Sequence, residues 1–177
     1  MILGKSVYLR PIEKEDMKSY HQAIHNEDIR FLTGTRNTIT LEQAYEYYER
    51  ITSDETRHDF AICLKDQHTI IGDLTILDID NINRKGGFRI AIHHPDYFNK
   101  GYGTEAVRLA LKYSFEDLSL NRLQLEVYSH NPRGIRAYEK AGFKQEGVIR
   151  ESLFLNGRYF DEIIMGILRK EYEQLYQ

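Results

Sequence analysis

The sequence predicts an α/β (α+β) fold in which a mixed, mostly antiparallel central sheet carries helices on both faces. Three observations support this prediction. The 177 residues suit a single domain over residues 1–177. Three strand patterns follow one another through short links, as in an antiparallel meander. A helix that opens at a glycine-rich loop then joins the third strand to a fourth, which indicates one parallel crossover.

The N-terminal region predicts one strand and two helices. Residues 6–10 alternate between apolar and polar side chains, as a strand does, and Pro11 ends them. Residues 13–25 carry apolar side chains at helical spacing, and a Thr, Gly and Asn-rich loop over 33–40 follows. Thr40 begins a second helix, because Thr40-Leu41-Glu42-Gln43 has the form of a capping box.

The rest of the chain completes the sheet. The meander strands are expected at 60–64, 70–77 and 86–92, the crossover helix at 104–115 and the next strand at 123–127. A helix over 133–141 ends at Gly142, a C-capping residue, and strands over 143–150 and 161–168 are joined by an Asn156-Gly157 turn. A polar helical tail begins at Lys170.

Composition excludes several classes of protein. A net charge of −3 does not suggest a nucleic-acid-binding protein. Cys63 is the only cysteine, so no internal disulfide forms, and its apolar strand indicates a buried hydrophobic residue rather than a nucleophile. Neither a signal peptide nor a membrane-spanning run is visible, and we expect a cytoplasmic protein with no membrane partner.

Acidic residues are concentrated between positions 13 and 55. They form either the solvated faces of two helices or a rim that attracts a cationic acceptor. The residues are Glu13, Glu15, Asp16, Glu27, Asp28, Glu42, Glu46, Glu49, Asp54 and Glu55.

The first chemical signal is the loop Phe98-Asn99-Lys100-Gly101-Tyr102-Gly103-Thr104, which leads into a helix. Two glycines let the backbone approach a ligand closely, and a helix N-terminus favours an anion. A plain glycine turn is the alternative. A P-loop is excluded, because the loop does not end in Gly-Lys-Ser/Thr. The loop matches the dinucleotide pattern G-x-G-x-x-G/A, but residues 93–97 separate it from the strand and only one further βα unit follows.

Residues 86–143 resemble the core of the GNAT superfamily of N-acetyltransferases. The resemblance lies in Gly101-Tyr102-Gly103 between a strand and a helix, followed by Asn131, Tyr138 and Gly142-Phe143. It points to the branch that contains ribosomal-protein N-terminal and spermidine acetyltransferases. Phe98 departs from the family, which usually has Gln or Arg there, so one side-chain contact near the cofactor pyrophosphate is absent.

The resemblance implies acetyl-CoA as cosubstrate and no metal. The strands at 88–92 and 123–128, the fourth and fifth along the chain, should splay apart, so that the pantetheine arm pairs with the freed edge of 88–92 as an added strand would. The backbone of 100–104 should hold the pyrophosphate. The implied cofactor-binding residues are Phe88, Ile90, Ala91, Ile92, Asn99, Lys100, Gly101, Tyr102, Gly103, Thr104, Asn131, Arg133 and Arg136.

Some of these residues also have plain structural interpretations. Asn131 either bonds the pantetheine amide or caps the helix that starts at Pro132, and the two roles are compatible. Arg133 and Arg136 either bind coenzyme phosphates or are surface charges. The pair His93-His94 indicates the end of a strand rather than a metal site, because no third ligand has suitable spacing. One of the two histidines could serve as a proton relay.

Two residues are expected to perform the chemistry. Tyr138 occupies the position of the family's general-acid tyrosine, and a neutral phenol can protonate a leaving thiolate. Its alternative is a core aromatic residue. Glu126 is the candidate base, because strand alternation points it away from the core-facing Leu125 and Val127. A solvated carboxylate is the alternative for Glu126, and the base could also act through water or come from the acidic helices.

The expected function is direct transfer of acetyl to a primary amine. The acceptor is either a protein N-terminus or a polyamine such as spermidine, and the segment 154–159 with Met165 resembles both types. A catalytically silent acyl-CoA sensor and a nucleotide-binding oxidoreductase are the alternatives. The oligomeric state stays open, with a homodimer as one option.

Overall fold

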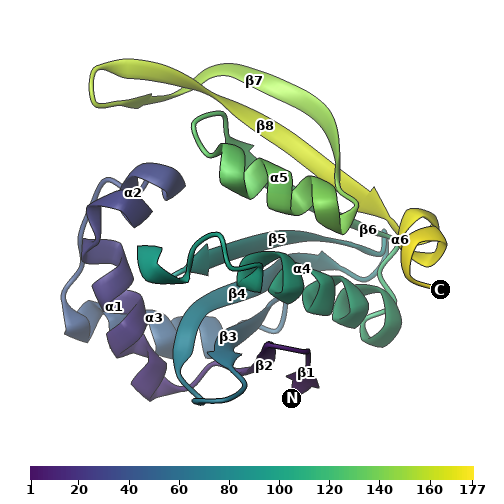
Figure 1. Ribbon diagram of the computed structural model, residues 1–177, viewed down its shortest axis with the longest axis horizontal. Helices are drawn as coiled ribbons and strands as arrows, with labels where there is room; N and C mark the ends of the chain where they lie inside the picture. Colours follow the sequence, from purple (N-terminus) through teal and green to yellow (C-terminus); the bar gives the residue numbers. More distant parts are fainter.

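A computed structural model of the protein describes residues 1–177 and confirms the expected fold class (Figure 1). Eight strands form one sheet: β1 Ile2–Leu3, β2 Val7–Pro11, β3 His58–Leu64, β4 Ile70–Asp80, β5 Lys85–Ile92, β6 Arg122–Tyr128, β7 Lys144–Leu155 and β8 Arg158–Leu168. Their order is β1-β2-β3-β4-β5-β6-β8-β7, and only β5 and β6 run parallel.

Six α-helices and three short helical turns accompany the sheet. The helices are α1 Met17–His25, α2 Glu27–Thr33, α3 Leu41–Thr52, α4 Tyr102–Lys112, α5 Pro132–Ala141 and α6 Arg169–Tyr176. The turns are η1 Lys14–Asp16, η2 Pro95–Tyr97 and η3 Tyr113–Asp117, the last of which continues α4 as a π-helix.

Helix α2 is the main element that the sequence did not predict. It has only 7 residues, too few to show a helical period of apolar side chains. Its ends are nevertheless well defined. The Asn26 side chain accepts the Ile29 N–H at 3.0 Å, and Gly34 ends the helix at φ 67°. This short helix matters, because it lines the functional site described below.

Helix α3 begins at the predicted capping box, and the last hairpin turns at the predicted residues. The Thr40 hydroxyl accepts the Gln43 N–H at 3.1 Å, and the Gln43 side chain accepts the Thr40 N–H at 2.9 Å. Strands β7 and β8 meet at Asn156 and Gly157, whose φ angles of 52° and 73° suit a tight hairpin turn. Both strands are longer than predicted, and the hairpin that they form extends beyond the helices that cover the sheet (Figure 1).

Alternation along the strands divides the helices between two layers. Helices α4 and α5 cover one face and contact each other, whereas α1, α2 and α3 pack together on the other (Figure 1). The main core lies under α4 and α5 and includes Phe60, Ile62, Leu74, Ile76, Val107, Leu111, Leu123 and Leu125. Cys63 is fully buried on the opposite face beside Tyr8 and Ala61.

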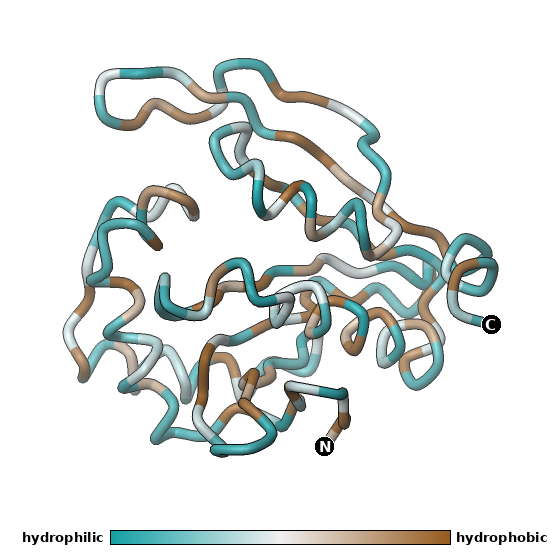
Figure 2. Tube along the Cα trace, viewed as in Figure 1, coloured by the Kyte–Doolittle hydropathy of each residue, from teal (hydrophilic) through white to brown (hydrophobic).

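Hydrophobic residues run mainly along the strands, and most turns are hydrophilic (Figure 2). No helix combines the length and the apolar character needed to cross a membrane.

The two parallel strands separate after a short paired region. Lys85, Gly86 and Gly87 of β5 pair with 122–124 of β6, and the pairing stops there. From Phe88 to Ile92, β5 pairs only with β4 on its other side. The backbone groups of this segment that face β6 therefore have no strand partner, which confirms the predicted splay.

A substitution at Gly142 tests how the C-terminal end of α5 is stabilised. It ends the helix at φ 112°, and a Cβ atom there would lie 2.6 Å from Leu175 Cδ1. Because L-residues are strained at this φ, Gly142→Ala should lower the free energy of unfolding by about 1–3 kcal/mol in a urea titration. Gly147→Ala is the matched control, since a Cβ at Gly147 meets no atom within 4 Å. Equal stability of the two variants would contradict this account of the helix end.

Candidate active site

The glycine loop ends in an exposed helix N-terminus. Asn99 has φ 58° and Gly101 φ 82°, and α4 starts directly after them at Tyr102. A Cβ atom at Gly101 would meet nothing within 4 Å, and one at Gly103 would meet only Ile92 Cγ1 at 3.9 Å. The backbone here faces open space, and the positive end of the helix dipole makes that space suited to an anion.

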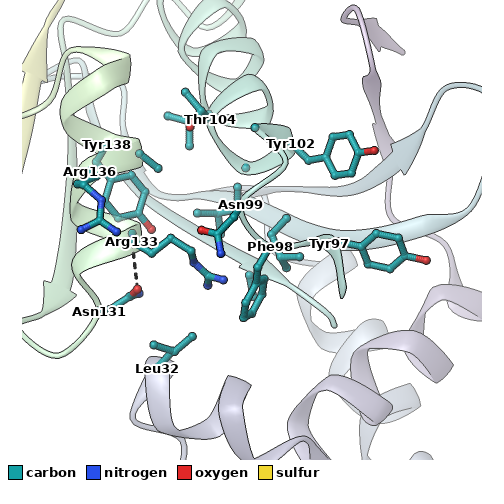
Figure 3. Close-up of a pocket in the computed structure, with 18 of the residues that line it drawn as sticks. Leu32, Tyr97, Phe98, Asn99, Tyr102, Thr104, Asn131, Arg133, Arg136 and Tyr138 are labelled. Atoms are coloured by element: carbon teal, nitrogen blue, oxygen red, sulfur yellow. Dashed lines mark hydrogen bonds between the residues drawn. The ribbon is translucent and has the colours of Figure 1, made fainter. Parts of the chain in front are cut away.

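The loop forms one wall of a first hollow of about 290 Å³ (Figure 3). Its other walls come from the unpaired part of β5, from α5 and from Ile29, Leu32 and Thr33 of α2. Every residue implied for cofactor binding lines it except two. Phe88 is buried in the core with 2% exposure, and Lys100 is exposed outside the hollow.

Arg133 and Phe98 both line this hollow and form a stacked pair. The guanidinium carbon of Arg133 lies 3.2 Å from the centre of the Phe98 ring, so the side chain reaches from α5 across to the loop (Figure 3). Burial lowers the pKa of Arg133. Phe98 therefore holds a cation beside the loop, a role that the sequence did not reveal, because the ring's partner lies 35 residues away in the chain.

Asn131 is the N-cap of α5. Its side-chain oxygen accepts the Gly134 N–H at 3.0 Å, and Pro132 follows as the first helical residue. The helix-cap interpretation is confirmed. The same residue lines the first hollow and also a second one, so a contact with a ligand remains compatible with the cap.

Tyr138 lies between the two hollows and lines both. Only 8% of the residue is exposed, and its ring packs edge-on against Phe88 at 6.4 Å and Phe143 at 6.0 Å. Burial raises the pKa of the Tyr138 phenol to about 12, with a smaller opposing effect of Arg133. The phenol is therefore neutral at physiological pH and available as a hydrogen-bond donor.

The second hollow, of about 400 Å³, lies between the sheet and the N-terminal helices. Glu126 lines it from β6, on the side of the strand opposite the buried Leu125 and Val127. Its carboxylate accepts a hydrogen bond from Gln124 Nε2 at 3.0 Å. The structure thus brings Glu126 and Tyr138 to one cavity, as the strand alternation indicated.

A row of hydrogen-bonded side chains beside the second hollow was not predicted from the sequence. His93 Nε2 lies 2.5 Å from Asp73 Oδ1, and its Nδ1 lies 2.7 Å from Ser19 Oγ. His93 is buried, whereas His94 is exposed and lies 3.4 Å from Asp96. The available signal was the polar pair Asp73 and Thr75 at alternate positions of an otherwise apolar strand.

The acidic residues of the N-terminal helices do not reach this site. None of those between positions 13 and 55 lines either hollow. Asp16 instead forms an ion pair with Arg10 at 2.7 Å, and Glu49 lies 3.3 Å from Lys14. The structure favours the solvated-face interpretation, and the carboxylates of the second hollow come from the sheet.

A family model described as "Acetyltransferase (GNAT) domain" matches residues 6–144, so the chain belongs to the GNAT acetyltransferase family. It is an N-acetyltransferase, which overturns the oxidoreductase alternative. The spermidine N(1)-acetyltransferase of Escherichia coli K12 is 30% identical over 167 residues, which cover 94% of this chain and 88% of that protein. A probable N-acetyltransferase of Bacillus subtilis, YjcK, is 31% identical over 187 residues, covering 98% of this chain and all of that protein.

Solved structures agree with this assignment. The spermidine N-acetyltransferase of Vibrio cholerae in complex with CoA and spermine superposes with a TM-score of 0.89 at 30% identity. The match covers 96% of this chain and 99% of the other. A dodecameric structure of the same Vibrio enzyme has a TM-score of 0.83 at 28% identity, covering 98% of this chain and 100% of that chain.

The cap at Asn131 can be separated from ligand binding. Asn131→Ala removes the acceptor for the Gly134 N–H and should lower the free energy of unfolding by about 1 kcal/mol. Asn131→Asp keeps an oxygen at the same position and should retain most of that stability in the same urea titration. If the Asp variant loses as much as the Ala variant, the side-chain oxygen is not what stabilises the helix start.

Proposed function

We propose that this protein transfers acetyl from acetyl-CoA directly to a primary amine of a polyamine such as spermidine, with residues 1–177 acting as one domain. One observation carries the proposal: Tyr138 lies between a hollow with an anion-binding loop and a second hollow that contains a carboxylate, Glu126. In acetyl transfer the thioester and the amine must come together, and the general acid must lie beside the sulfur that leaves. The polyamine acceptor is supported by the spermidine acetyltransferases among the relatives.

The first hollow offers contacts for the pyrophosphate and for the pantetheine arm of the cofactor. The free amides at the start of α4 would bind the pyrophosphate, and Arg133 and Arg136 would add positive charge beside it. The pantetheine arm would lie along Phe88–Ile92, where β5 offers backbone groups that β6 leaves unpaired. In this arrangement the buried Phe88 contributes its backbone only, and the thioester reaches Tyr138.

The second hollow suits the amine. Glu126 would accept a proton as the amine nitrogen attacks the thioester carbonyl, directly or through a water molecule. The tetrahedral intermediate then collapses with cleavage of the carbon–sulfur bond. Tyr138 donates its proton to the departing sulfur, and the phenol is restored from solvent. The products are the N-acetylated amine and CoA with a neutral thiol, so protons balance.

Direct transfer is favoured over an acetyl-enzyme intermediate. Cys63, the only cysteine, has no exposed surface and lines neither hollow. Burial raises the pKa of its thiol, which suppresses the thiolate that a nucleophile needs. The sensor alternative would be favoured by a Tyr138 displaced from the cofactor hollow, and Tyr138 lines that hollow.

We also infer that the chain forms a homo-oligomer. The relative from Vibrio cholerae is dodecameric, and a homodimer would be the smallest such assembly. In this chain the edge strand β7 carries Val148, Ile149 and Phe154 with 45%, 46% and 48% exposure. An edge strand with exposed apolar side chains is a suitable surface for a second copy.

Tyr138→Phe tests the mechanism. It removes only the hydroxyl, so kcat for spermidine should fall by roughly 10²–10⁴-fold while the affinity for acetyl-CoA is kept. Steady-state kinetics and calorimetry measure the two quantities. In the wild type, a phenol with a pKa of about 12 stays protonated as pH rises from about 8 to 10, so its ionisation should cause no loss of kcat in this range.

Tyr159→Phe is the matched control, because Tyr159 is 62% exposed and lines neither hollow. Unchanged turnover of Tyr138→Phe would remove this residue from the mechanism. Spermidine, a neutral N-terminal peptide and a basic one should be compared as acceptors. If only the peptides are acetylated, the polyamine proposal is wrong.

A further inference from the structure

Strand β4 places two polar side chains on the face that covers the second hollow. Asp73 and Thr75 alternate with Leu74 and Ile76, which are fully buried in the core on the other face. Burial of polar groups is costly unless they are paired. The partners of Asp73 and Thr75 therefore indicate what each does.

Thr75 belongs to a closed network. Its hydroxyl donates to Asp59 Oδ1 at 2.7 Å, and Asp59 also accepts two hydrogen bonds from Arg57, at 2.6 and 2.8 Å. The carboxylate of Asp59 is thus neutralised by a cation of the protein. This network stabilises the sheet and offers no free charge to a ligand.

Asp73 differs, because no lysine or arginine pairs with it. The only ion-pair or hydrogen-bond partner of its side chain is His93. A carboxylate only accepts hydrogen bonds, so the His93 Nε2 atom that faces Asp73 carries a proton. The Ser19 hydroxyl forms the hydrogen bond to Nδ1, so both ring nitrogens have a partner. These hydrogen bonds fix the orientation of Asp73 without a lysine or arginine beside it.

Only two of the three hydrogen-bonded side chains border the cavity. Asp73 and His93 line the second hollow, whereas Ser19 does not. Ser19 therefore orients the imidazole and cannot reach an acyl group. This excludes a nucleophilic serine, despite the Ser-His-Asp order of the hydrogen bonds.

Two tyrosines complete the surroundings of Asp73. Tyr20 and Tyr47 both line the hollow and stack with ring centres 5.4 Å apart and planes 11° apart. Burial raises the pKa of Tyr20, and the neighbouring Tyr47 and Asp73 raise it further. Arg50 and Arg57 already lie over the Tyr47 ring, at 5.3 and 6.0 Å from its centre. Tyr20 therefore supplies the aromatic surface beside a carboxylate that pairs with no lysine or arginine, and such a surface favours an alkylammonium group.

The strand register sets the distance between Asp73 and the proposed base. Asp73 is opposite Ala91 of β5, and continuing the β5–β6 register places Glu126 beside Arg89. The two carboxylates are thus separated by two strand spacings and by two residues along the strand. Their Cα atoms are therefore roughly 12 Å apart, or more where the strands splay. An extended triamine can span this distance.

We propose that Asp73, positioned by His93 and Ser19, binds a second ammonium group of the acceptor while the reacting amine lies at Glu126. This inference rests on the proposed function and refines it. The site would select amines with a charge at each end over amines that lack the charge at the far end. Asp73 is thus a specificity-determining residue, and His93 is a positioning residue.

Two arginines that line the hollow carry positive charge that opposes this binding. Arg30 donates to the Arg36 carbonyl oxygen at 2.8 Å and holds the loop after α2, so the second test uses Arg89 instead. Arg89 is exposed, lines the hollow from β5 and forms no ion pair with an acidic residue. Removal of its charge should strengthen the binding of a cationic acceptor, the opposite of the effect expected at Asp73.

The experiment compares spermidine with N1-acetylspermidine and N8-acetylspermidine. Each of these keeps one primary amine and the central secondary ammonium but lacks the far ammonium. In Asp73→Asn, kcat/KM for spermidine should fall roughly tenfold to hundredfold, mainly through KM, as expected for a lost hydrogen bond to a charged group. Values for the two monoacetylated amines should change less than about twofold. Asp78→Asn, the same change at an exposed position of β4 outside the hollow, is the matched control.

Two further variants test the arrangement. Arg89→Gln should lower KM for spermidine selectively, and this holds even if Asp73→Asn fails to fold. His93→Asn should reduce the preference for spermidine, and it should add nothing once Asp73 is already Asn, since it acts through that residue. Thermal stability and acetyl-CoA binding of each variant separate misfolding from lost selectivity.

Several outcomes would overturn the inference. Equal losses for all three amines, or a fall in kcat alone, would make Asp73 and His93 a structural pair or a proton relay. A rise of KM for spermidine in Arg89→Gln would show that the charge of Arg89 does not oppose the acceptor, against the arrangement proposed here. If the wild type acetylates spermidine but Asp73→Asn keeps its preference, only this inference fails. If the wild type acetylates no polyamine, the proposed function fails as well.

Discussion

The early end of pairing between β5 and β6 is the constraint on which the site depends. Only Lys85–Gly87 pair with β6, and beyond them the two strands separate. The separation leaves backbone groups of Phe88–Ile92 without partners inside the sheet. Backbone groups that lack a strand partner must be satisfied by water or by a ligand, so this edge is suited to an extended ligand. In the proposed function, the pantetheine arm of acetyl-CoA would pair with this edge, next to the glycine loop that would bind the pyrophosphate.

The alternation of side chains gives the two faces of the same strands different tasks. On β4 and β6, Leu74 and Leu125 pack under α4 and α5, whereas Asp73 and Glu126 face the N-terminal helices. Because the period is two residues, a shift of register by one would bury both carboxylates in the core. Tyr138 belongs to neither strand. Helix α5 places it between the hollows, and the cap at Asn131 and the turn at Gly142 hold that helix at both ends.

The sequence predicted the features that are local. The Gly101-Tyr102-Gly103 loop, the orientation of Glu126 and the caps of α3 and α5 all depend on residues within one or two turns or strand periods. The Ser19–His93–Asp73 chain does not, since its hydrogen bonds join residues 74 and 20 positions apart. The sequence suggested only that Phe98 lacks a side-chain contact with the pyrophosphate. Its partner Arg133 is also distant in the sequence, so the stacked pair could not be predicted. The acidic residues of the N-terminal helices are close together in the sequence, yet none of them lines the site.

The central claim, that the splayed edge of β5 receives the cofactor, is tested most directly by hydrogen–deuterium exchange with and without acetyl-CoA. Amide protons of Phe88–Ile92 that face β6 should become protected on binding, together with those of Gly101–Thr104 at the start of α4. Amides of the paired segment Lys85–Gly87 should change little, since the sheet already protects them. Tight binding of acetyl-CoA without protection along Phe88–Ile92 would contradict the account.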